Sequence, residues 1–464
     1  MSENKNTLRR GASWTLGVFL VITGLLDWIY LSGPAIEMVG KWAPLVWVIT
    51  VGLMTISCYI FLEMAIMHKD KAGGMATYVI EAFKNRSSVP GLLAMWGYVT
   101  SWGLAVAAIA TFAGYFVQFF IPDFNIVIGA LVIVIGCFFM NLLSVDIANK
   151  IQSLIIPGII ASIAVILGGW VTQPVLTPDF SQVQLYVSGD NPIITFFGAC
   201  LLISWSAYAM EAVLTLIAEY KDPVADAKKS VYGAAAVFMV MTVGICGSLT
   251  YLLPLDIVLN DPFTPLLPLA EATFGTAYAY GLGILFIVGL ILGINCCFIA
   301  SSRVLYEASS LGYLPGIFSK LNKNQSPVAA LAFILLINVA LILGVGEAPV
   351  FMVIAGTIGY FVTVILANFS IYFMRKDFPD AEREFRVPDF LIPVSIGIGI
   401  INILFLVVGS TSYTIGNIAV GVAVLLSVFP LYWYRTKVED RKSAAGSSSF
   451  AVAATELEVE RLEK

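Results

Sequence analysis

The sequence LGVFLVITGLLDWIYLSGP, residues 16–34, is long and apolar enough to cross a bilayer, yet it carries a carboxylate, Asp27, near its middle. Two glycines, Gly24 and Gly33, and the proline Pro34 lie close to that carboxylate. Because glycine and proline weaken helix continuity, we expect the backbone to unwind here. A charge at membrane depth costs about 3 kcal/mol or more unless it is paired or faces a wet cavity. Asp27 is therefore a candidate functional residue.

The composition of the whole chain is that of a membrane protein. Of its 464 residues, 59% are hydrophobic and 12% are charged, which is too apolar for a soluble protein of this size. Apolar runs of about 20 residues recur from end to end with short loops between them. The sequence predicts an all-α membrane protein of twelve spans: 13–34, 43–66, 91–120, 124–144, 151–172, 193–218, 230–254, 276–306, 327–345, 349–374, 389–409 and 412–435.

The charged residues orient these spans. Basic residues of short loops gather on the cytoplasmic side of a membrane. With twelve spans and both termini in the cytoplasm, all of the 25 lysines and arginines except Lys41 fall in cytoplasmic segments. The opposite loops carry acidic residues instead, such as Asp179, Asp190 and Glu347. The asymmetry predicts a multi-pass protein of the cell membrane with both termini cytoplasmic.

Side chains that hold metals or act as nucleophiles are sparse. The six cysteines all fall inside apolar spans, where we expect them to pack as small side chains. The one histidine, His68, lies in a predicted cytoplasmic loop. We expect no metal site, no cofactor and no enzyme activity. Nucleic-acid binding is not expected either, because the basic residues are spread over many loops.

The sixth span has a second unusual centre, which reads SWSAYAME. Its aliphatic run is interrupted by two hydroxyl groups, two aromatic rings and a carboxylate: Ser204, Ser206, Trp205, Tyr208 and Glu211. Spans one and six therefore both carry a mid-membrane acid beside aromatic side chains, five spans apart. Paired interruptions in corresponding halves are typical of inverted-repeat transporters, whose binding site lies at the membrane midplane.

Several loop sequences resemble the amino acid–polyamine–organocation (APC) superfamily. They are GGMATY at 73–78, AEYKDP at 218–223, ASSRVLY at 300–306 and LGYLP at 311–315, which are similar to the inner-end signatures of its members. Within the superfamily, the chain most resembles the glutamate/GABA antiporter group. That narrower resemblance is carried by PDFS at 178–181, FPD at 378–380 and FRVP at 385–388.

The resemblance implies a LeuT-like fold, a five-plus-five inverted repeat with spans one and six unwound. It also implies transport of amino acids or amines by alternating access. The chain departs from its relatives at two places. Many members carry a Gly-Ser-Gly-type stretch whose backbone amides hold a substrate carboxylate, whereas this chain has LDWI at 26–29. Some relatives carry a lysine near the position of Pro157 that is linked to proton coupling, and no lysine occurs there.

The predicted substrate site combines residues of four spans. We expect it to be lined by Asp27, Thr23, Gly24, Trp28, Tyr98, Ser204, Trp205, Ser206, Tyr208 and Asn295. Trp205 and Tyr208 are also predicted to gate it. The alternatives are a helix-capping or internally paired role for Asp27, ordinary packing for the aromatic rings, and an interhelical hydrogen bond for Asn295. We interpret Glu211 as a structural acid that holds unwound backbone amides.

The sequence thus predicts a secondary active transporter, proton-coupled or an exchanger, of a small amine-bearing solute that is an amino acid or its amine. Asp27 would hold the substrate ammonium, and we favour protons over sodium as the coupling ion. The first alternative is a zwitterionic amino acid permease in which Asp27 is the proton site. The second is a membrane sensor or enzyme subunit. The expected parts are a cytoplasmic N-terminus (1–12), a ten-helix transport core (13–374), helices eleven and twelve (375–436) and a cytoplasmic tail (437–464).

Overall fold

The computed structural model describes residues 10–24, 26–71, 73–143, 155–176, 191–323 and 326–440. Most of the predicted tail and the loop at 177–190 lie outside these residues. The described chain is almost entirely helical. Its helices are α1 (Trp14–Gly24), α2 (Asp27–Val39), η1 (Gly40–Trp42), α3 (Ala43–Met67), α4 (Gly74–Phe83), α5 (Val89–Gln118), α6 (Ile126–Leu143), α8 (Ile155–Thr172), α9 (Pro192–Tyr208), η3 (Ala209–Leu216), α10 (Pro223–Leu252), α11 (Leu255–Asn260), α12 (Leu266–Phe274), α13 (Thr276–Ser310), η4 (Gly316–Ser319), α14 (Val328–Val345), α15 (Pro349–Asp377), α16 (Leu391–Val407), η5 (Gly409–Ser412), α17 (Ile415–Leu426), α18 (Val428–Tyr434) and η6 (Arg435–Glu439).

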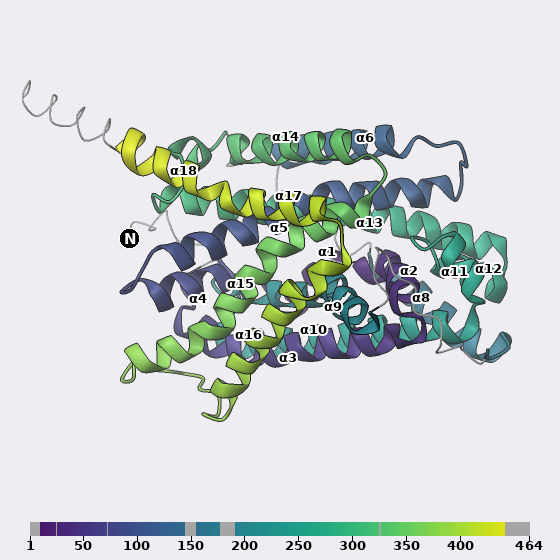
Figure 1. The fold of residues 1–464 in the computed structure, drawn as a ribbon, viewed down its shortest axis with the longest axis horizontal. Coiled ribbons are helices and arrows are strands. Elements are labelled where there is room, and N and C mark those ends of the chain that lie inside the picture. The colour runs from purple at the N-terminus through teal and green to yellow at the C-terminus, as the bar shows by residue number, and fades with distance from the viewer. Residues whose placement is uncertain are drawn as a thin grey trace, which may run out of the picture.

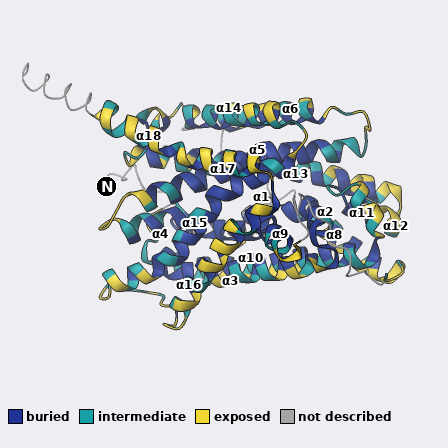
Figure 2. Cartoon of the chain, viewed as in Figure 1, coloured by how far each residue is buried: buried dark blue, intermediate teal, exposed yellow. Residues whose placement is uncertain are grey.

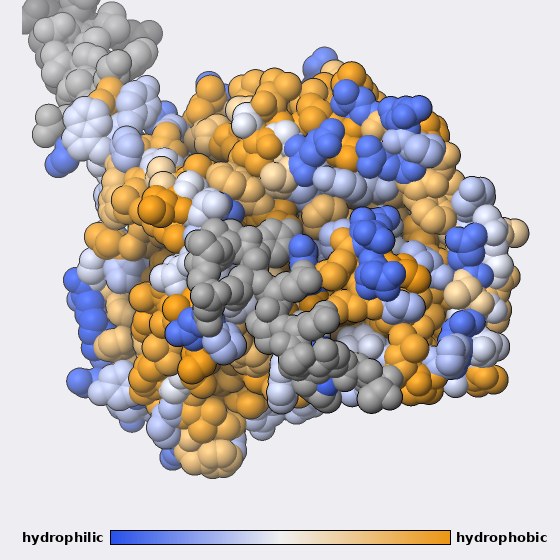
Figure 3. Space-filling model, turned by 45° about the vertical axis from the view of Figure 1, so that its right-hand side comes forward, coloured by the Kyte–Doolittle hydropathy of each residue, from blue (hydrophilic) through white to orange (hydrophobic). Residues whose placement is uncertain are grey.

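The long helices lie side by side in a bundle (Figure 1). Within the described residues, nine helical segments are long and apolar enough to cross a membrane, and α6 and α8 are shorter apolar helices. The all-α, multi-pass prediction is confirmed, while the count of twelve spans stays a prediction. Helices α5 and α15 form the buried centre, whereas α14 and α16 expose one face (Figure 2). Hydrophobic side chains cover broad areas of the surface (Figure 3).

Both unusual spans change their backbone geometry near the acid. The first ends as α1 at Gly24 and resumes as α2 at Asp27, with Leu26 as the residue before the new helix. The sixth runs as α9 to Tyr208 and then continues as the 3-10 helix η3, which contains Glu211. Each acid therefore lies in the first turn of a new helical segment.

The predicted break does not extend to Gly33 and Pro34, which lie inside α2. A Cβ atom on Gly33 would lie 1.8 Å from the backbone oxygen of Pro262, so the glycine permits a loop to approach the helix. Because proline lacks an N–H group, Pro34 removes one intrahelical bond, but α2 continues to Val39. The expectation that these two residues unwind the backbone was therefore wrong.

The central pair α5 and α15 touch backbone to backbone. A Cβ atom on Gly97 would lie 2.3 Å from the Gly359 oxygen, so a larger side chain cannot fit at this crossing. The Thr363 hydroxyl donates to the Ala94 carbonyl oxygen across the same interface (2.8 Å). This close crossing fixes α5, which supplies side chains to both acid sites described below.

One end of the bundle is closed by contacts between the start of the described chain and the segment after η3. The Gly11 and Ala12 N–H groups both donate to the Glu219 carbonyl oxygen, and the Lys221 N–H donates to the Ala12 carbonyl oxygen (2.9 Å each). Arg10 forms an ion pair with Asp70 beside this bridge (2.7 Å). These contacts hold the N-terminal end of α1 against the far end of the sixth span.

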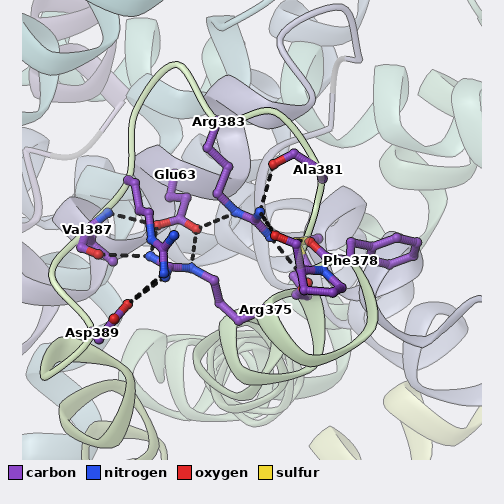
Figure 4. A network of polar contacts seen from close by, with 10 residues as sticks. Glu63, Arg375, Phe378, Ala381, Arg383, Val387 and Asp389 are labelled. Carbon is purple, nitrogen blue, oxygen red and sulfur yellow. Dashed lines mark hydrogen bonds and ion pairs between the residues drawn. The ribbon is translucent and has the colours of Figure 1, made fainter.

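The C-terminal ends of α3 and α15 are held by a buried charge cluster (Figure 4). Glu63 is 1% exposed and accepts hydrogen bonds from Arg375 (2.5 and 2.6 Å), Arg383 (3.0 Å) and the Val387 N–H (2.8 Å). Arg375 also pairs with Asp389 (2.7 Å). Figure 4 shows both guanidinium groups pointing toward the Glu63 carboxylate from either side.

The variant Glu63→Gln is expected to lower the free energy of unfolding by about 3 kcal/mol, because it leaves two buried guanidinium groups without their shared anion. Thermal unfolding in detergent measures this. The matched control is Glu384→Gln, whose ion pair with Lys69 is partly exposed and should change stability by less than about 1 kcal/mol. Equal losses for the two variants would contradict the importance of the buried cluster.

Candidate functional site

The Asp27 carboxyl group lies at the break between α1 and α2 and is 1% exposed. Its Oδ1 atom accepts a hydrogen bond from the Tyr30 hydroxyl one turn further along α2. Among the described residues, Oδ2 has no hydrogen-bond partner, and no basic side chain forms an ion pair with the group. A buried charge without a cation is costly, so this oxygen is available to a ligand that brings a positive charge or a proton.

Aromatic rings surround this carboxyl group on one side. The Tyr30 ring stacks on Phe112 of α5, with ring centroids 3.9 Å apart and planes at 21°. Cys297 of α13 is close enough to Asp27 to interact with it electrostatically. Trp28 points elsewhere and meets Phe238 of α10 edge to face at 6.1 Å. The site at Asp27 is thus formed by α2, α5 and α13.

The second buried acid, Glu211, lies at the start of η3 and is fully buried. Among the described residues, its hydrogen-bond donor is the Tyr360 hydroxyl (3.1 Å to Oε1), not a backbone amide, which corrects our interpretation of Glu211. Tyr98 of α5 lies beside the same carboxyl group, with its ring 6.3 Å from that of Tyr360. Glu211 therefore accepts a phenol hydrogen bond at Oε1, while its Oε2, like Oδ2 of Asp27, has no partner among the described residues.

The two acids lie at different depths along α5. Phe112 stacks on the Tyr30 ring at the Asp27 site, and Tyr98 lies beside Glu211. These two residues are fourteen positions apart on α5. At 1.5 Å per residue these positions are about 21 Å apart along the helix axis.

The chain matches the family of proteins described as "Amino acid permease" over residues 14–433. It belongs to the amino acid permease family. A relative of Bacillus subtilis (strain 168), an uncharacterized amino acid permease, is 26% identical over 72% of this chain and 77% of its own length. A candidate arginine/ornithine antiporter of the same organism is 23% identical over 75% of this chain and 81% of its own length. The resemblance to the APC superfamily is confirmed.

A solved structure supports the same fold for this permease. The crystal structure of a manganese transporter from Eremococcus coleocola, in complex with an aromatic bis-isothiourea substituted compound, aligns with a TM-score of 0.56. The alignment covers 94% of this permease and 98% of that chain at 14% sequence identity. Within the described part of the permease, no group of three or more His, Cys, Asp or Glu side chains is placed to hold a metal ion.

The other predicted site residues of the permease are buried and scattered. Tyr208 donates to Asn402 and stacks on Phe361, and Trp205 packs on Gly356, where a Cβ atom would lie 2.6 Å from the indole ring. These are packing contacts in this structure, and the gating roles of Trp205 and Tyr208 stay predictions.

The polar residues of the predicted substrate site make different kinds of contact from one another. Asn295 accepts from Asn141 of α6 (2.6 Å), which is the interhelical bond given above as its alternative role. Ser204 bonds to its own helix at the Cys200 oxygen (2.6 Å). Ser206 Oγ is buried without a partner among the described residues. The side chain of Thr23 and the surroundings of Gly24 lie outside what the structure describes.

The permease also places residues at the site that the predicted set lacked. Tyr30 could have been found, because positions three apart lie on one face of a helix and Asp27 begins that helix. Phe112 carries no such signal, since its role depends on how α5 packs against α2. Tyr360 could not be placed at Glu211 from the sequence, because the two residues are 149 positions apart in the chain.

The Asp27–Tyr30 hydrogen bond can be measured by a double-mutant cycle. Tyr30→Phe keeps the stack on Phe112 but removes the donor, and it should lower the free energy of unfolding by about 1–3 kcal/mol without substrate. In an Asp27→Asn background the same change should cost at least about 1 kcal/mol less. Denaturant unfolding in detergent gives both values. An identical cost in the two backgrounds would mean that the bond does not stabilise the permease.

Proposed function

We propose that this permease is a secondary active transporter that moves a small amine-bearing solute, an amino acid or its amine, across the cell membrane. It works by alternating access, either with proton coupling or by exchange. The observation that best supports a cationic substrate is the buried Asp27 carboxyl group, whose Oδ2 atom has no partner among the described residues. A substrate ammonium would supply the missing positive charge and donate to that oxygen.

The surroundings of Asp27 suit this role in two further ways. The carboxyl group belongs to the first turn of α2, and the positive end of a helix dipole favours a negative charge there. The stacked rings of Tyr30 and Phe112 offer electron-rich faces near the site, which attract organic cations. Together these features favour the charged carboxylate once a cation is bound.

The coupling of substrate transport to a proton or to a second substrate follows from the chemistry of the Asp27 carboxyl group. Asp27 can hold a proton or pair with an ammonium group, but it cannot do both. Release of the substrate would therefore allow a proton or a second substrate to take its place. We assign the charge recognition to Asp27 and not to Glu211, because Asp27 lies at the start of a separate α-helix, whereas the 3-10 helix η3 of Glu211 continues directly from α9.

The architecture proposed for this mechanism is the five-plus-five inverted repeat, with twelve spans and both termini in the cytoplasm. The transport core would comprise residues 13–374, with helices eleven and twelve at 375–436. The changes of backbone geometry after Gly24 and after Tyr208, and the fold of the related transporter structure, support this proposal.

A zwitterionic amino acid permease with Asp27 as its proton site is the second candidate. The name of the amino acid permease relative favours it. The backbone N–H groups at the start of α2 could also bind a substrate carboxylate, as helix N-termini do. In that case Asp27 must be protonated while the carboxylate is bound.

The variant Asp27→Asn keeps the side-chain volume and removes the charge. Loss of a buried ion pair costs roughly 2–5 kcal/mol, so amine affinity should fall about 30-fold or more. Binding of radiolabelled amine to purified protein measures this. Glu211→Gln removes the other buried acid and should change affinity by less than about threefold. Unchanged affinity in Asp27→Asn, or equal losses in both variants, would contradict the ammonium site.

The affinity for amines should fall as the pH is lowered, because protons compete for the Asp27 carboxylate. The slope approaches about tenfold per pH unit at pH values well below the pKa of Asp27, where the carboxyl group is mostly protonated in the free protein. Whatever amine binding remains in Asp27→Asn should lack this dependence. Isothermal titration at several pH values provides the measurement, and a wild type whose amine affinity does not vary with pH would refute competition at Asp27.

A further inference from the structure

The eleventh span of the permease, formed by α16 and η5, crosses the bundle toward α9, the first half of the sixth span (Figure 1). Much of α16 is exposed. Its buried residues recur every three or four positions and so form one stripe along the helix: Ser395, Ile398, Gly399, Asn402 and Phe405. The stripe contacts α15 at Ser395, whose hydroxyl donates to the Asn368 carbonyl oxygen (2.8 Å), and it contacts α9 further along.

The contact between the eleventh span and α9 begins near the first residue of α9. The Ser412 hydroxyl donates to the Ile194 carbonyl oxygen (2.9 Å). A Cβ atom on Gly409 would lie 2.5 Å from the Phe197 oxygen, so the two backbones touch here. These contacts fix the start of α9 against η5.

The same contact ends at the last residue of α9, Tyr208. Its hydroxyl donates to Oδ1 of Asn402 on α16, and both side chains are fully buried. The Tyr208 ring also stacks on Phe361 of α15, with ring centroids 5.5 Å apart and planes at 27°. From Ile194 to Tyr208 is fourteen positions, or about 21 Å of helix, so the eleventh span follows α9 over almost its whole length.

The second half of the sixth span, η3, begins at Ala209 and packs against other helices, among them α1, α4 and α10. At the contact with α4, a Cβ atom on Gly74 would lie 2.8 Å from the Thr215 side chain of η3. The two halves of the sixth span are thus held by different neighbours. Relative movement of the halves would be absorbed at the junction between Tyr208 and Ala209, because hinges form at the ends of packed elements.

We propose that Asn402 is a positioning residue for transport, which holds the Tyr208 ring and the end of α9 against the eleventh span. The hydrogen bond fixes one side of the junction, so that the sixth span bends between Tyr208 and Ala209 when its second half moves. This inference rests on the alternating access proposed above. It gives the eleventh span, which lies outside the proposed transport core, a role in the movement of that core.

The first test measures the exposure of the junction and requires no transported solute. Ala209→Cys places a thiol directly after Tyr208, at a position that is 3% exposed, and the six native cysteines are buried. Adding Asn402→Leu should raise the rate at which N-ethylmaleimide alkylates this thiol at least about fivefold, because the junction opens more often. Tyr208→Phe removes the other half of the bond and should have the same effect, and the double variant should add nothing further.

The matched control is Ser395→Ala, which removes a buried polar contact of the same stripe that is made to α15 and not to α9. Its alkylation rate should stay within about twofold of the wild-type rate, because the junction keeps its hydrogen bond. Asn402→Asp retains an acceptor oxygen for Tyr208 and should also restore a low rate. Tyr208→Phe tests the bond by itself if Asn402→Leu does not fold.

The second measurement is exchange of radiolabelled amine in proteoliposomes. Asn402→Leu should lower the maximal rate at least about fivefold but change amine affinity less than about threefold, because the affinity depends on Asp27. Unchanged alkylation in both Asn402→Leu and Tyr208→Phe would overturn the positioning role, and so would an equal increase in Ser395→Ala. A wild type that moves neither amines nor amino acids would refute the proposed function, and the alkylation rates would still decide the role of Asn402.

Discussion

The buried carboxyl group of Asp27 is the constraint on which the rest of the account depends. An unpaired charge at membrane depth costs about 3 kcal/mol or more, and the described residues provide no cation for it. What they provide is one phenol donor, the start of a helix and an aromatic wall. Such surroundings hold the Asp27 carboxylate in place. The positive charge that pairs with it must then be supplied by a bound ligand.

The packing of the bundle keeps that site in position. The backbone contact between Gly97 and Gly359 fixes α5 against α15, and α5 in turn brings Phe112 to Asp27 and Tyr98 to Glu211. At one end of the bundle, the bridge from Ala12 joins the start of α1 to the segment after η3. The Glu63 cluster joins α3 to α15. Of these two sets of contacts, the bridge involves α1 and the Glu63 cluster does not.

The sequence was a reliable guide to whatever depends on composition and local pattern. The all-helical membrane fold, the interrupted first span and the family could all be predicted from hydrophobic runs and short motifs. Contacts between distant positions could not. Gly33 was taken for a helix breaker because nothing local indicates that Pro262 packs against it. The partner of Glu211 could not be found either, because Tyr360 reaches it only through the crossing of α5 and α15.

The most direct test of the central claim compares amino acids with the amines formed by their decarboxylation, using thermal stabilisation of the purified wild-type permease. A ligand that binds the folded state raises its unfolding temperature according to its affinity. A cation site at Asp27 predicts stabilisation by amines that have no carboxylate. Stabilisation by amino acids alone, with none by their amines, would contradict it.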